Sequence, residues 1–317
     1  MQVFSKADID RILDWQSLVE AMRAGHRGPR PQIGDRLMRE GEDSLLVRIA
    51  WMGGALGLKA VTIFPENART DPPVPSIQGQ FLLFDGERGH VEAVMDGIAL
   101  TAWKTAADSA LGCDLLARAE ARTLLMVGAG TQARSLVRAH LSVRPGIERV
   151  LLWNRSRAGA ERLASELSEI GREVTVTEAL EAAVGEADIV SSATMAASPI
   201  IRGAWLKPGT HVDLVGAFRP DMREADDETL LRGRLFVDAR ETTVHEIGEI
   251  LIPLREKVIG EENVLGDLFD LVAGSPGRLT ETDITVFKNG GGAHLDLMTA
   301  RLVADKAARS REDSRGR

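Results

Sequence analysis

In the first third of the chain, apolar and polar residues alternate over short segments. In the remainder, strand-like segments alternate with helical segments. Alternation with a period of two predicts strands that are buried on one face. Two amphipathic segments, about residues 6–14 and 16–25, have helical spacing, and the Ala-rich run 97–117 contains no proline and predicts a long helix. The strands predicted in this part are residues 44–51, 56–64, 77–84 and 90–95.

From about residue 121, apolar strand-like segments alternate with amphipathic helical segments. This order is typical of a parallel sheet with helices on both faces. We therefore predict an α/β fold, with a Rossmann-type doubly wound parallel sheet and a smaller α+β domain. The strands predicted here are residues 123–128, 149–154, 173–177, 187–193, 211–217, 234–239 and 283–288, and the clearest helices are 133–143 and 158–171.

Composition narrows the classes of function. The formal net charge of −8 leaves no basic excess for nucleic-acid phosphates, so we expect a small-molecule ligand and no nucleic-acid partner. Cys113 is the only cysteine, which excludes an internal disulfide and favours a reducing compartment. No apolar run approaches the roughly 20 residues that span a bilayer, and no His, Asp or Glu spacing suggests a metal. The first residues are acidic where a signal peptide is basic, so we expect a cytoplasmic protein without a membrane partner.

The strongest chemical signal follows the apolar segment 123–127. Gly128 permits a tight turn, Gly130 lets the backbone approach a pyrophosphate, and the small Ala133 lets the next helix lie close to the strand. The free N–H groups and the dipole at the start of that helix favour an anion. The alternative is a tight turn that binds nothing. We predict a dinucleotide site formed by Gly128, Ala129, Gly130, Thr131, Gln132 and Ala133.

The end of the next predicted strand indicates which dinucleotide binds. Enzymes that use NAD usually have Asp or Glu there, which binds the ribose 2′-hydroxyl. This chain instead has Asn154, Arg155, Ser156 and Arg157. A neutral residue beside two arginines does not repel a 2′-phosphate and can bind it with charge-assisted hydrogen bonds. A solvated loop with incidental arginines is the alternative. We predict that NADP(H) is preferred, and NAD(H) stays open as a tolerated cofactor.

Several longer stretches carry a family resemblance that covers roughly residues 36–300. They are, in this order, GLKAVTIFPEN, DGIALTAWKTAA, VGAGTQA, ADIVSSAT, KPGTHVDLVGA and ITVFKNGGGAHLDL. In these stretches the chain resembles the ornithine cyclodeaminase/mu-crystallin family, and within it the imino-acid reductases that act on Δ1-pyrroline-2-carboxylate or other ketimines. The resemblance implies an NAD(P)-dependent enzyme and a homodimer that pairs through the substrate domain.

The predicted domains combine this resemblance with the periodicity. Residues 119–293 are expected to form the NADP(H)-binding Rossmann domain. Residues 1–118 and 294–317 are expected to form a discontinuous substrate-binding and dimerisation domain, because the apolar helical segment 293–308 should pack back on the first part of the chain. The charged segment 310–317 is expected to be disordered.

Lys59 is the predicted catalytic residue. On a strand it would share a face with Gly57, Val61 and Ile63, and lysine is seldom buried on an apolar face without a partner. An edge-strand lysine that reaches solvent is the alternative. The resemblance implies that Lys59 is the active-site lysine of the family. A lysine that is removed from water can act as an acid or base near neutral pH.

Two further cations are predicted to bind the substrate. Arg36, by itself an arginine in a polar loop, matches the carboxylate-binding arginine of the family. Lys104 stands where most relatives have arginine, so it keeps the charge but loses the bidentate geometry that suits a carboxylate. An ordinary i,i+4 pair of Lys104 with Asp108 is the alternative.

Further cofactor-binding residues are predicted at strand ends. Thr194, Val215 and Gly216 follow predicted strands, and open α/β sheets bind ligands at the carboxyl ends of their strands. Asn289 and Gly290 match the stretch that lies beside the nicotinamide in the family. A flexible hinge turn is the alternative for residues 289–292.

Two departures from the family pattern indicate the reaction. Phe218 stands where ornithine cyclodeaminases have a catalytic aspartate, and Asp221, three residues further on, is out of register with that position. Segment 45–51 also lacks the glutamate that these enzymes use. We therefore predict NADPH-dependent reduction of a cyclic imino acid to L-proline or a homologue. The substrate would be Δ1-pyrroline-2-carboxylate or the six-membered Δ1-piperideine-2-carboxylate. Ornithine cyclodeaminase or alanine dehydrogenase activity stays one alternative, and a NADPH-dependent binding protein without turnover stays a second.

Overall fold

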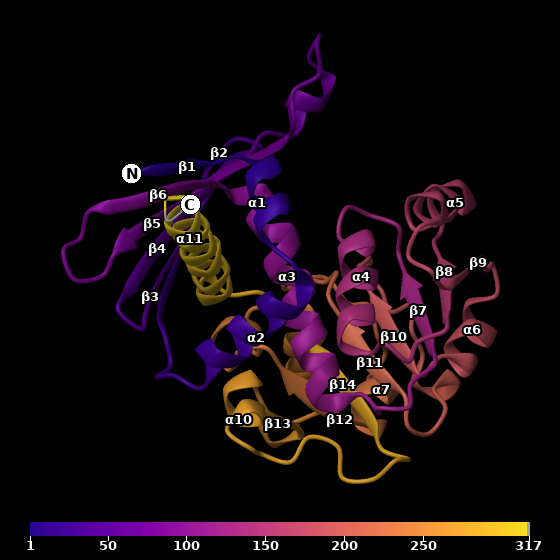
Figure 1. Cartoon of the computed structure of the whole chain (residues 1–317). Coiled ribbons are helices and arrows are strands. Elements are labelled where there is room, and N and C mark those ends of the chain that lie inside the picture. The colour runs from indigo at the N-terminus through magenta and orange to yellow at the C-terminus, as the bar shows by residue number, and fades with distance from the viewer. Residues whose placement is uncertain (316–317) are drawn as a thin grey trace. The chain divides into compact units, whose positions relative to one another are not determined.

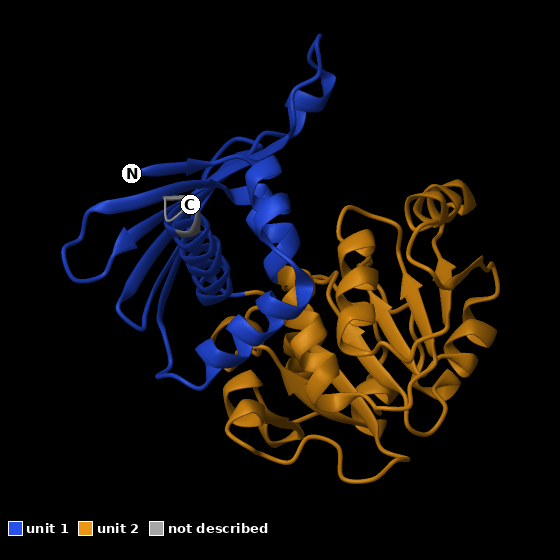
Figure 2. Ribbon diagram, in the orientation of Figure 1, with its two compact units in different colours: residues 1–104, 292–317 blue, residues 105–291 orange. Residues whose placement is uncertain are grey.

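The structure, a computed structural model, describes residues 1–315 of the chain and the side-chain environment of residues 1–312 (Figure 1). The chain divides into two compact units, of which unit 1 is Met1–Lys104 with Gly292–Arg317 and unit 2 is Thr105–Gly291 (Figure 2). The predicted domains differ from these units mainly in the long helix α3 (Gly97–Leu116), which the units divide after Lys104. Helix α11 (Ala293–Arg315) continues through residues that were expected to be disordered, and residues 316–317 lie outside the described residues.

Unit 1 is built on a six-stranded sheet with the order β1-β6-β5-β4-β3-β2. Strands β2 to β6 pair antiparallel with one another, and β1 pairs parallel with β6. The alternating pattern predicted β3 to β6 but missed β1, which is very short, and β2, an exposed edge strand without clean alternation. The strands are β1 (Gln2–Phe4), β2 (Gln32–Glu40), β3 (Asp43–Met52), β4 (Ala55–Ile63), β5 (Ile77–Asp85) and β6 (Val91–Asp96).

Helix α11 covers one face of this sheet and contacts β3, β4 and β5. A Cβ atom at Gly57 would lie 2.3 Å from Phe81 and 3.1 Å from Leu297 of α11, so only glycine allows this close approach. The buried apolar residues on the covered face include Ala50, Val61, Phe81, Leu83 and Met95. The remaining helices of unit 1 are α1 (Lys6–Ile12), α2 (Trp15–His26) and the short η1 (Pro65–Arg69).

Unit 2 contains an eight-stranded sheet with the order β13-β12-β14-β11-β10-β7-β8-β9, and its neighbouring strands pair in parallel. The predicted α/β, doubly wound fold is therefore confirmed. The pattern missed β13, which has three residues, and several short helices after residue 226. The strands are β7 (Thr123–Val127), β8 (Arg149–Trp153), β9 (Glu173–Val176), β10 (Ile189–Ser192), β11 (His211–Leu214), β12 (Gly233–Val237), β13 (Val264–Gly266) and β14 (Ile284–Lys288).

The winding of this sheet reverses between β7 and β10. From β7 the chain proceeds through β8 to β9 at one edge, then returns to β10 on the other side of β7 and continues to β11. Ligands of open α/β sheets bind at the carboxyl ends of the strands at such a switch point. The helices of unit 2 are α4 (Ala133–Val143), α5 (Arg157–Glu166), α6 (Leu180–Glu186), η2 (Gly203–Trp205), α7 (Asp227–Arg232), α8 (Arg240–Thr243), α9 (Gly248–Arg255), η3 (Glu261–Asn263) and α10 (Leu268–Val272).

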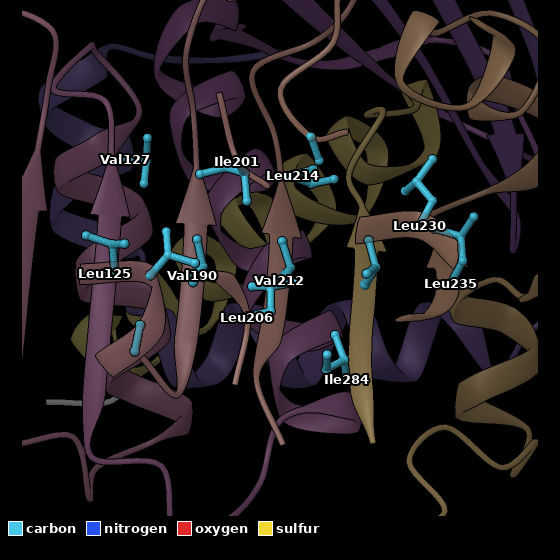
Figure 3. Packing of buried hydrophobic residues seen from close by; sticks show 14 of the residues in the cluster. Leu125, Val127, Val190, Ile201, Leu206, Val212, Leu214, Leu230, Leu235 and Ile284 are labelled. Atoms are coloured by element: carbon cyan, nitrogen blue, oxygen red, sulfur yellow. The ribbon is translucent and has the colours of Figure 1, made fainter. Parts of the chain in front are cut away.

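An apolar cluster lies against one side of the unit 2 sheet and packs on the strands at the switch point. Figure 3 shows Leu125 of β7, Val190 of β10 and Val212 of β11 side by side on adjacent strands. Near-continuous apolar strands of this kind are typical of parallel sheets that are covered on both faces. Among residues 1–315, no helix is both long enough and apolar enough to cross a bilayer.

Candidate functional site

The predicted dinucleotide motif lies at the switch point of the unit 2 sheet. Gly128 follows β7 with φ +103°, and a Cβ atom there would lie 2.6 Å from the Ala193 carbonyl oxygen, so glycine is required. Gly130 and Thr131 are exposed. A Cβ atom built at Gly130 has no other described atom within 4 Å. This open space, beside the first N–H groups of α4, fits a phosphate group.

The other residues of the motif support that turn. Ala133 is fully buried at the start of α4, as close packing of the helix on the sheet requires. Gln132 is the N-cap residue, without a side-chain capping hydrogen bond, and both it and Ala129 are half-buried. The N–H groups at this helix start are therefore not used by a side-chain cap from Gln132.

The residues after β8 differ in the hydrogen bonds and ion pairs that they form. The Asn154 amide donates to the Ser156 carbonyl oxygen at 2.9 Å, which shapes the loop. Arg157 is paired with Glu161 at 2.8 Å and with Glu178 at 2.9 Å, and hydrogen bonds to these carboxylates raise the pKa of its guanidinium. These side chains are more than half exposed, so the pairs are weak.

Arg155 and Ser156 are exposed on the same loop. Of the two predicted arginines, Arg155 thus has the more accessible charge. Arg157 has to break its ion pairs with Glu161 and Glu178 before it can bind a phosphate. The sequence pattern alone predicted the same role for both arginines.

Thr194, Val215 and Gly216 lie where β10 and β11 end, and all three are half-buried. The backbone N–H groups of Thr194 and Gly216 both donate to the buried carboxylate of Glu224, at 2.7 and 2.5 Å. The structure therefore brings these predicted residues together at the carboxyl edge of the sheet, near Gly128. Sequence reasoning missed Glu224, because it follows no recognisable motif.

Asn289 and Gly290 are anchored more firmly than a flexible turn would be. The Asn289 side-chain amide is buried and donates to the Thr105 carbonyl oxygen and to the Ser109 hydroxyl, both at 2.9 Å. The Asp238 carboxylate accepts from the N–H groups of Gly290 at 3.0 Å and Gly291 at 2.5 Å. Asp238 was also missed, although its position just after an apolar strand is a usual signal for a functional acid.

Ser109 connects this turn to a buried polar network. Its hydroxyl donates to one oxygen of Asp213 at 2.8 Å, and His140 contacts the other oxygen at 3.1 Å. Burial, the largest single effect, would lower the pKa of His140, but its hydrogen bonds to Asp213 and Cys113 and their electrostatic attraction together raise the pKa to about 10. Asp213 of β11 is therefore bound both to Ser109 of α3 and to His140 of α4. Asp213 and His140 are both fully buried, which favours a structural role.

Lys59, on β4 of unit 1, is buried with only 4% of its surface exposed. Its ammonium group lies 2.9 and 2.8 Å from the two oxygens of Asp296 on α11 and donates to the Thr101 hydroxyl on α3 at 3.1 Å. The expected face and the need for a partner were thus correctly argued from the strand pattern, and the solvent-exposed alternative is wrong. Asp296 was missed. An acid on the buried face of an apolar helix is the signal that could have found it.

The register of the unit 1 sheet separates the predicted residues Arg36 and Lys59. Lys59 pairs directly with Arg48 of β3, and residues that are opposite each other across strands point to the same face. Arg36 lies on β2, not in a loop as expected, and pairs with Val47, the neighbour of Arg48. Because successive residues alternate between faces, Arg36 points away from the face that carries Lys59. Arg36 is also exposed.

Cations gather around a buried histidine in unit 1. His294 is fully buried, and burial first, then the charges of His26, Lys104, Arg48 and Arg30, hold its pKa well below the usual value. Lys104 is itself buried, one turn of α3 beyond Thr101, the contact of Lys59. The imidazole of His294 is therefore neutral and lies near four basic groups, of which Arg48 is paired with Asp35 at 2.8 Å.

The residues that bear on cyclodeaminase chemistry lie on the surface of unit 2. Phe218 is 56% exposed, and Arg219 lies over its ring. Asp221 is also exposed and is paired with Arg219 at 2.9 Å. No group of three or more His, Cys, Asp or Glu side chains among the described residues could hold a metal ion.

Comparison with known proteins gives consistent matches over nearly the whole chain. The model of the ornithine cyclodeaminase/mu-crystallin family matches residues 22–311. A Δ1-pyrroline-2-carboxylate reductase of Paracoccus denitrificans is 50% identical over 305 residues, which is 96% of each chain.

Solved structures agree with the match to this family. The Thermococcus litoralis Δ1-pyrroline-2-carboxylate reductase, in complex with NADH and L-proline, has a TM-score of 0.90 at 30% identity and covers 98% of each chain. An archaeal alanine dehydrogenase dimer with bound NAD has a TM-score of 0.90 at 25% identity, over 98% of this chain and 97% of that one. The resemblance found in the sequence motifs is confirmed.

Proposed function

Because the chain belongs to the ornithine cyclodeaminase/mu-crystallin family, we propose that it is an NADPH-dependent reductase of cyclic imino acids. The substrate is Δ1-pyrroline-2-carboxylate, with Δ1-piperideine-2-carboxylate second, and the product is L-proline or its homologue. The observation that carries the proposal is the buried Lys59–Asp296 pair on a sheet face where other cations gather. Such a site suits a substrate that has both a carboxylate and a nitrogen to be protonated.

The cofactor is proposed to bind along the carboxyl edge of the unit 2 sheet. Gly128 to Ala133 hold the pyrophosphate, and Thr194, Val215 and Gly216 line the next part of the edge. Asn289 and Gly290 belong to the same proposed set, as the wall beside the nicotinamide, with Asp238 fixing their backbone. Bound NAD(P)H supplies the hydride that reduces the C=N bond.

Lys59 is proposed to supply the proton. The hydride adds to C2 of the imine and one proton adds to its nitrogen, so the C=N bond becomes a CH–NH bond. The Lys59 ammonium carries that proton, and Asp296 and Thr101 hold it in one orientation. A protonated imine is the better hydride acceptor, so a fixed donor at nitrogen promotes transfer at carbon.

The substrate carboxylate is proposed to bind to Lys104 together with Arg48 and Arg30. Lys104 lies on α3, the helix of Thr101, and Arg48 is opposite Lys59 across β3 and β4. All three cations influence the buried His294. Arg36 stays a prediction that the sheet register disfavours, because its strand position faces the other way. The exposed Phe218 and Asp221 argue against the cyclodeaminase reaction, which needs an acid held at the substrate.

A homodimer is proposed from the uncovered face of the unit 1 sheet. This face carries exposed apolar residues, among them Met38 at 55%, Ile49 at 39% and Trp51 at 51%. Exposed large apolar residues that share one face of a sheet often mark a protein interface. A second copy of the chain is the natural partner, and the related archaeal alanine dehydrogenase is a dimer. The domain division at 118/119 and 293/294 and a cytoplasmic location, favoured by the reduced Cys113, stay proposals.

The cofactor preference gives a testable prediction. Arg155→Glu places a negative charge beside the proposed 2′-phosphate site, and the ratio of kcat/KM for NADPH to that for NADH should fall by about 100-fold, the effect of a lost charge-assisted hydrogen bond plus repulsion. Steady-state kinetics with both cofactors measures the ratio. The matched control is Arg172→Glu, an exposed arginine just before β9, at the amino edge of the sheet. Equal ratios in the two variants would refute the role of Arg155.

A substrate comparison tests the proposed reaction. NADPH absorbance is followed with Δ1-pyrroline-2-carboxylate, with Δ1-piperideine-2-carboxylate, and with pyruvate plus ammonia, and ammonia release is followed with L-ornithine. We expect rapid NADPH oxidation with the cyclic imines and little with the other two. Ammonia release from ornithine without net use of NADPH would instead establish a cyclodeaminase. Tight NADPH binding with no turnover of any compound would leave a binding protein.

A further inference from the structure

One buried carboxylate holds both backbone turns where β10 and β11 leave the unit 2 sheet. Oε1 of Glu224 accepts from the Ser192 hydroxyl at 2.6 Å, from the Thr194 N–H at 2.7 Å and from the Thr194 hydroxyl at 2.8 Å. Oε2 accepts from the Gly216 N–H at 2.5 Å and from the Ala217 N–H at 3.3 Å. Each oxygen thus serves one turn, and Glu224 joins the two turns.

The two turns are also in direct contact. A Cβ atom at Gly216 would lie 2.0 Å from the Thr194 carbonyl oxygen and 2.3 Å from its nitrogen, so no side chain fits there. A shift of either turn therefore displaces the other, because the two turns are packed without space between them. The carboxylate determines where this joined pair of turns lies.

The backbone at Glu224 is itself anchored by hydrogen bonds. Its backbone N–H and that of Ala225 donate to the two oxygens of Glu249, at 2.8 and 3.0 Å. The buried Lys288 ammonium donates to the Leu214 carbonyl oxygen at 2.9 Å, which fixes the end of β11 from the other side. Burial raises the pKa of Glu224, while Lys288 and the hydrogen-bond donors oppose this rise.

We propose that Glu224 is a positioning residue for the dinucleotide. This inference rests on the proposed function, in which the turns at Thr194 and Gly216 form part of the cofactor wall. These turns lie beside the Gly128 turn at the switch point, where an open α/β sheet binds its ligand. Glu224 is fully buried and needs no contact with the ligand. It acts through the peptide groups that it orients, and a carboxylate is required because both of its ends must accept hydrogen bonds.

Glu224→Gln tests this directly. The amide keeps one accepting oxygen and turns an NH2 group toward N–H donors, so one of the two turns loses its anchor. We expect the Kd for NADPH, measured by its fluorescence, to rise by about 10-fold and kcat to fall by about 100-fold, since a misplacement of about 1 Å at the reacting centre has such an effect. The KM for Δ1-pyrroline-2-carboxylate at saturating NADPH should stay near the wild-type value.

Asp188→Asn is the matched control. It makes the same change of a carboxylate to an amide in a buried acid of unit 2, at the amino end of β7. There Asp188 accepts from the backbone N–H groups of Arg122 at 2.8 Å and Thr123 at 3.0 Å, and not from the two turns. This variant should keep both the Kd for NADPH and kcat near wild type. Equal losses in the two variants would overturn the proposal, because they would reflect a general weakening of the core.

A third variant covers the case in which Glu224→Gln does not fold. Ser192→Ala removes one donor from the same Glu224 oxygen and lies inside the sheet, fully buried. It should fold and raise the Kd for NADPH by a smaller factor than Glu224→Gln, and an unchanged Kd would count against the proposal. If wild-type protein binds neither NADPH nor NADH, the proposed function itself fails. If wild-type protein binds and Glu224→Gln binds equally well, only the role of Glu224 fails.

Discussion

Lys59→Met is expected to lower kcat for imine reduction by about 1000-fold, within the range that a positioned proton donor contributes. Methionine fills a similar volume on the apolar face, so the strand and its neighbours keep their packing. It carries no proton for the imine nitrogen. Binding of NADPH, which is proposed to depend on residues of unit 2, should stay close to wild type. Stopped-flow or steady-state NADPH oxidation measures the loss.

The same change leaves Asp296 buried without its cation, and removing one partner of a buried pair typically costs about 3–5 kcal/mol of stability. Lys59→Met combined with Asp296→Asn removes this charge and should recover most of that stability, measured by denaturant unfolding, without recovering turnover. A single or double variant that folds, binds NADPH and keeps a tenth or more of the wild-type kcat would contradict the role of Lys59.

Gly128→Ala should raise the Kd for NADPH by about 100-fold and also lower the unfolding midpoint. The added Cβ atom meets the Ala193 carbonyl oxygen at 2.6 Å and sits on a backbone with φ +103°, and strain of this kind is of the order of 1–3 kcal/mol. The turn must shift to relieve the strain. Because this turn is proposed to cradle the pyrophosphate, its displacement removes the binding geometry.

Gly130→Ala is the informative partner of that variant. The site of its added methyl group has no other described atom within 4 Å, so the fold and the unfolding midpoint should be unchanged. The methyl group would nevertheless occupy the space in which the backbone approaches the pyrophosphate, so affinity for NADPH should fall. Wild-type affinity in Gly130→Ala would mean that the phosphates do not pass here.

The architecture of unit 2 could be predicted because its strands are buried and its helices are amphipathic. The apolar run of β7, the glycine turn after it and the spacing of α4 all point to one local structure. Edge strands have no such signal. β2 lies at the sheet edge with most of its residues exposed, so neither face imposes a hydrophobic period, and the sequence pattern places Arg36 in a loop.

The site was predictable only where a residue belongs to a local motif. Gly128, Thr194 and Lys59 could be placed from the strands that precede or contain them. Asp296 comes from a helix 237 residues away from Lys59 in the chain, and no pattern along the sequence indicates that pairing. Glu224 is similar, because it holds turns that belong to two earlier strands. Contacts between distant segments decide which of the many acids become buried partners.

The sequence also could not show on which face of the sheet a cation lies. Arg36 and Arg48 are both arginines in the same stretch of chain, and only the register of β2, β3 and β4 shows that Arg48 shares a face with Lys59. A shift of one residue in register would reverse this assignment. Sequence position alone therefore could not choose between them.

The most direct test of imine reduction follows the hydride itself. NADPH that carries deuterium at the transferring C4 position is incubated with the protein and Δ1-pyrroline-2-carboxylate, and the product is analysed by chiral separation and mass spectrometry. We expect L-proline with one deuterium at Cα, formed in equal amount to the cofactor oxidised. Absence of proline, or proline without deuterium while the cofactor is consumed, would contradict the proposed reaction.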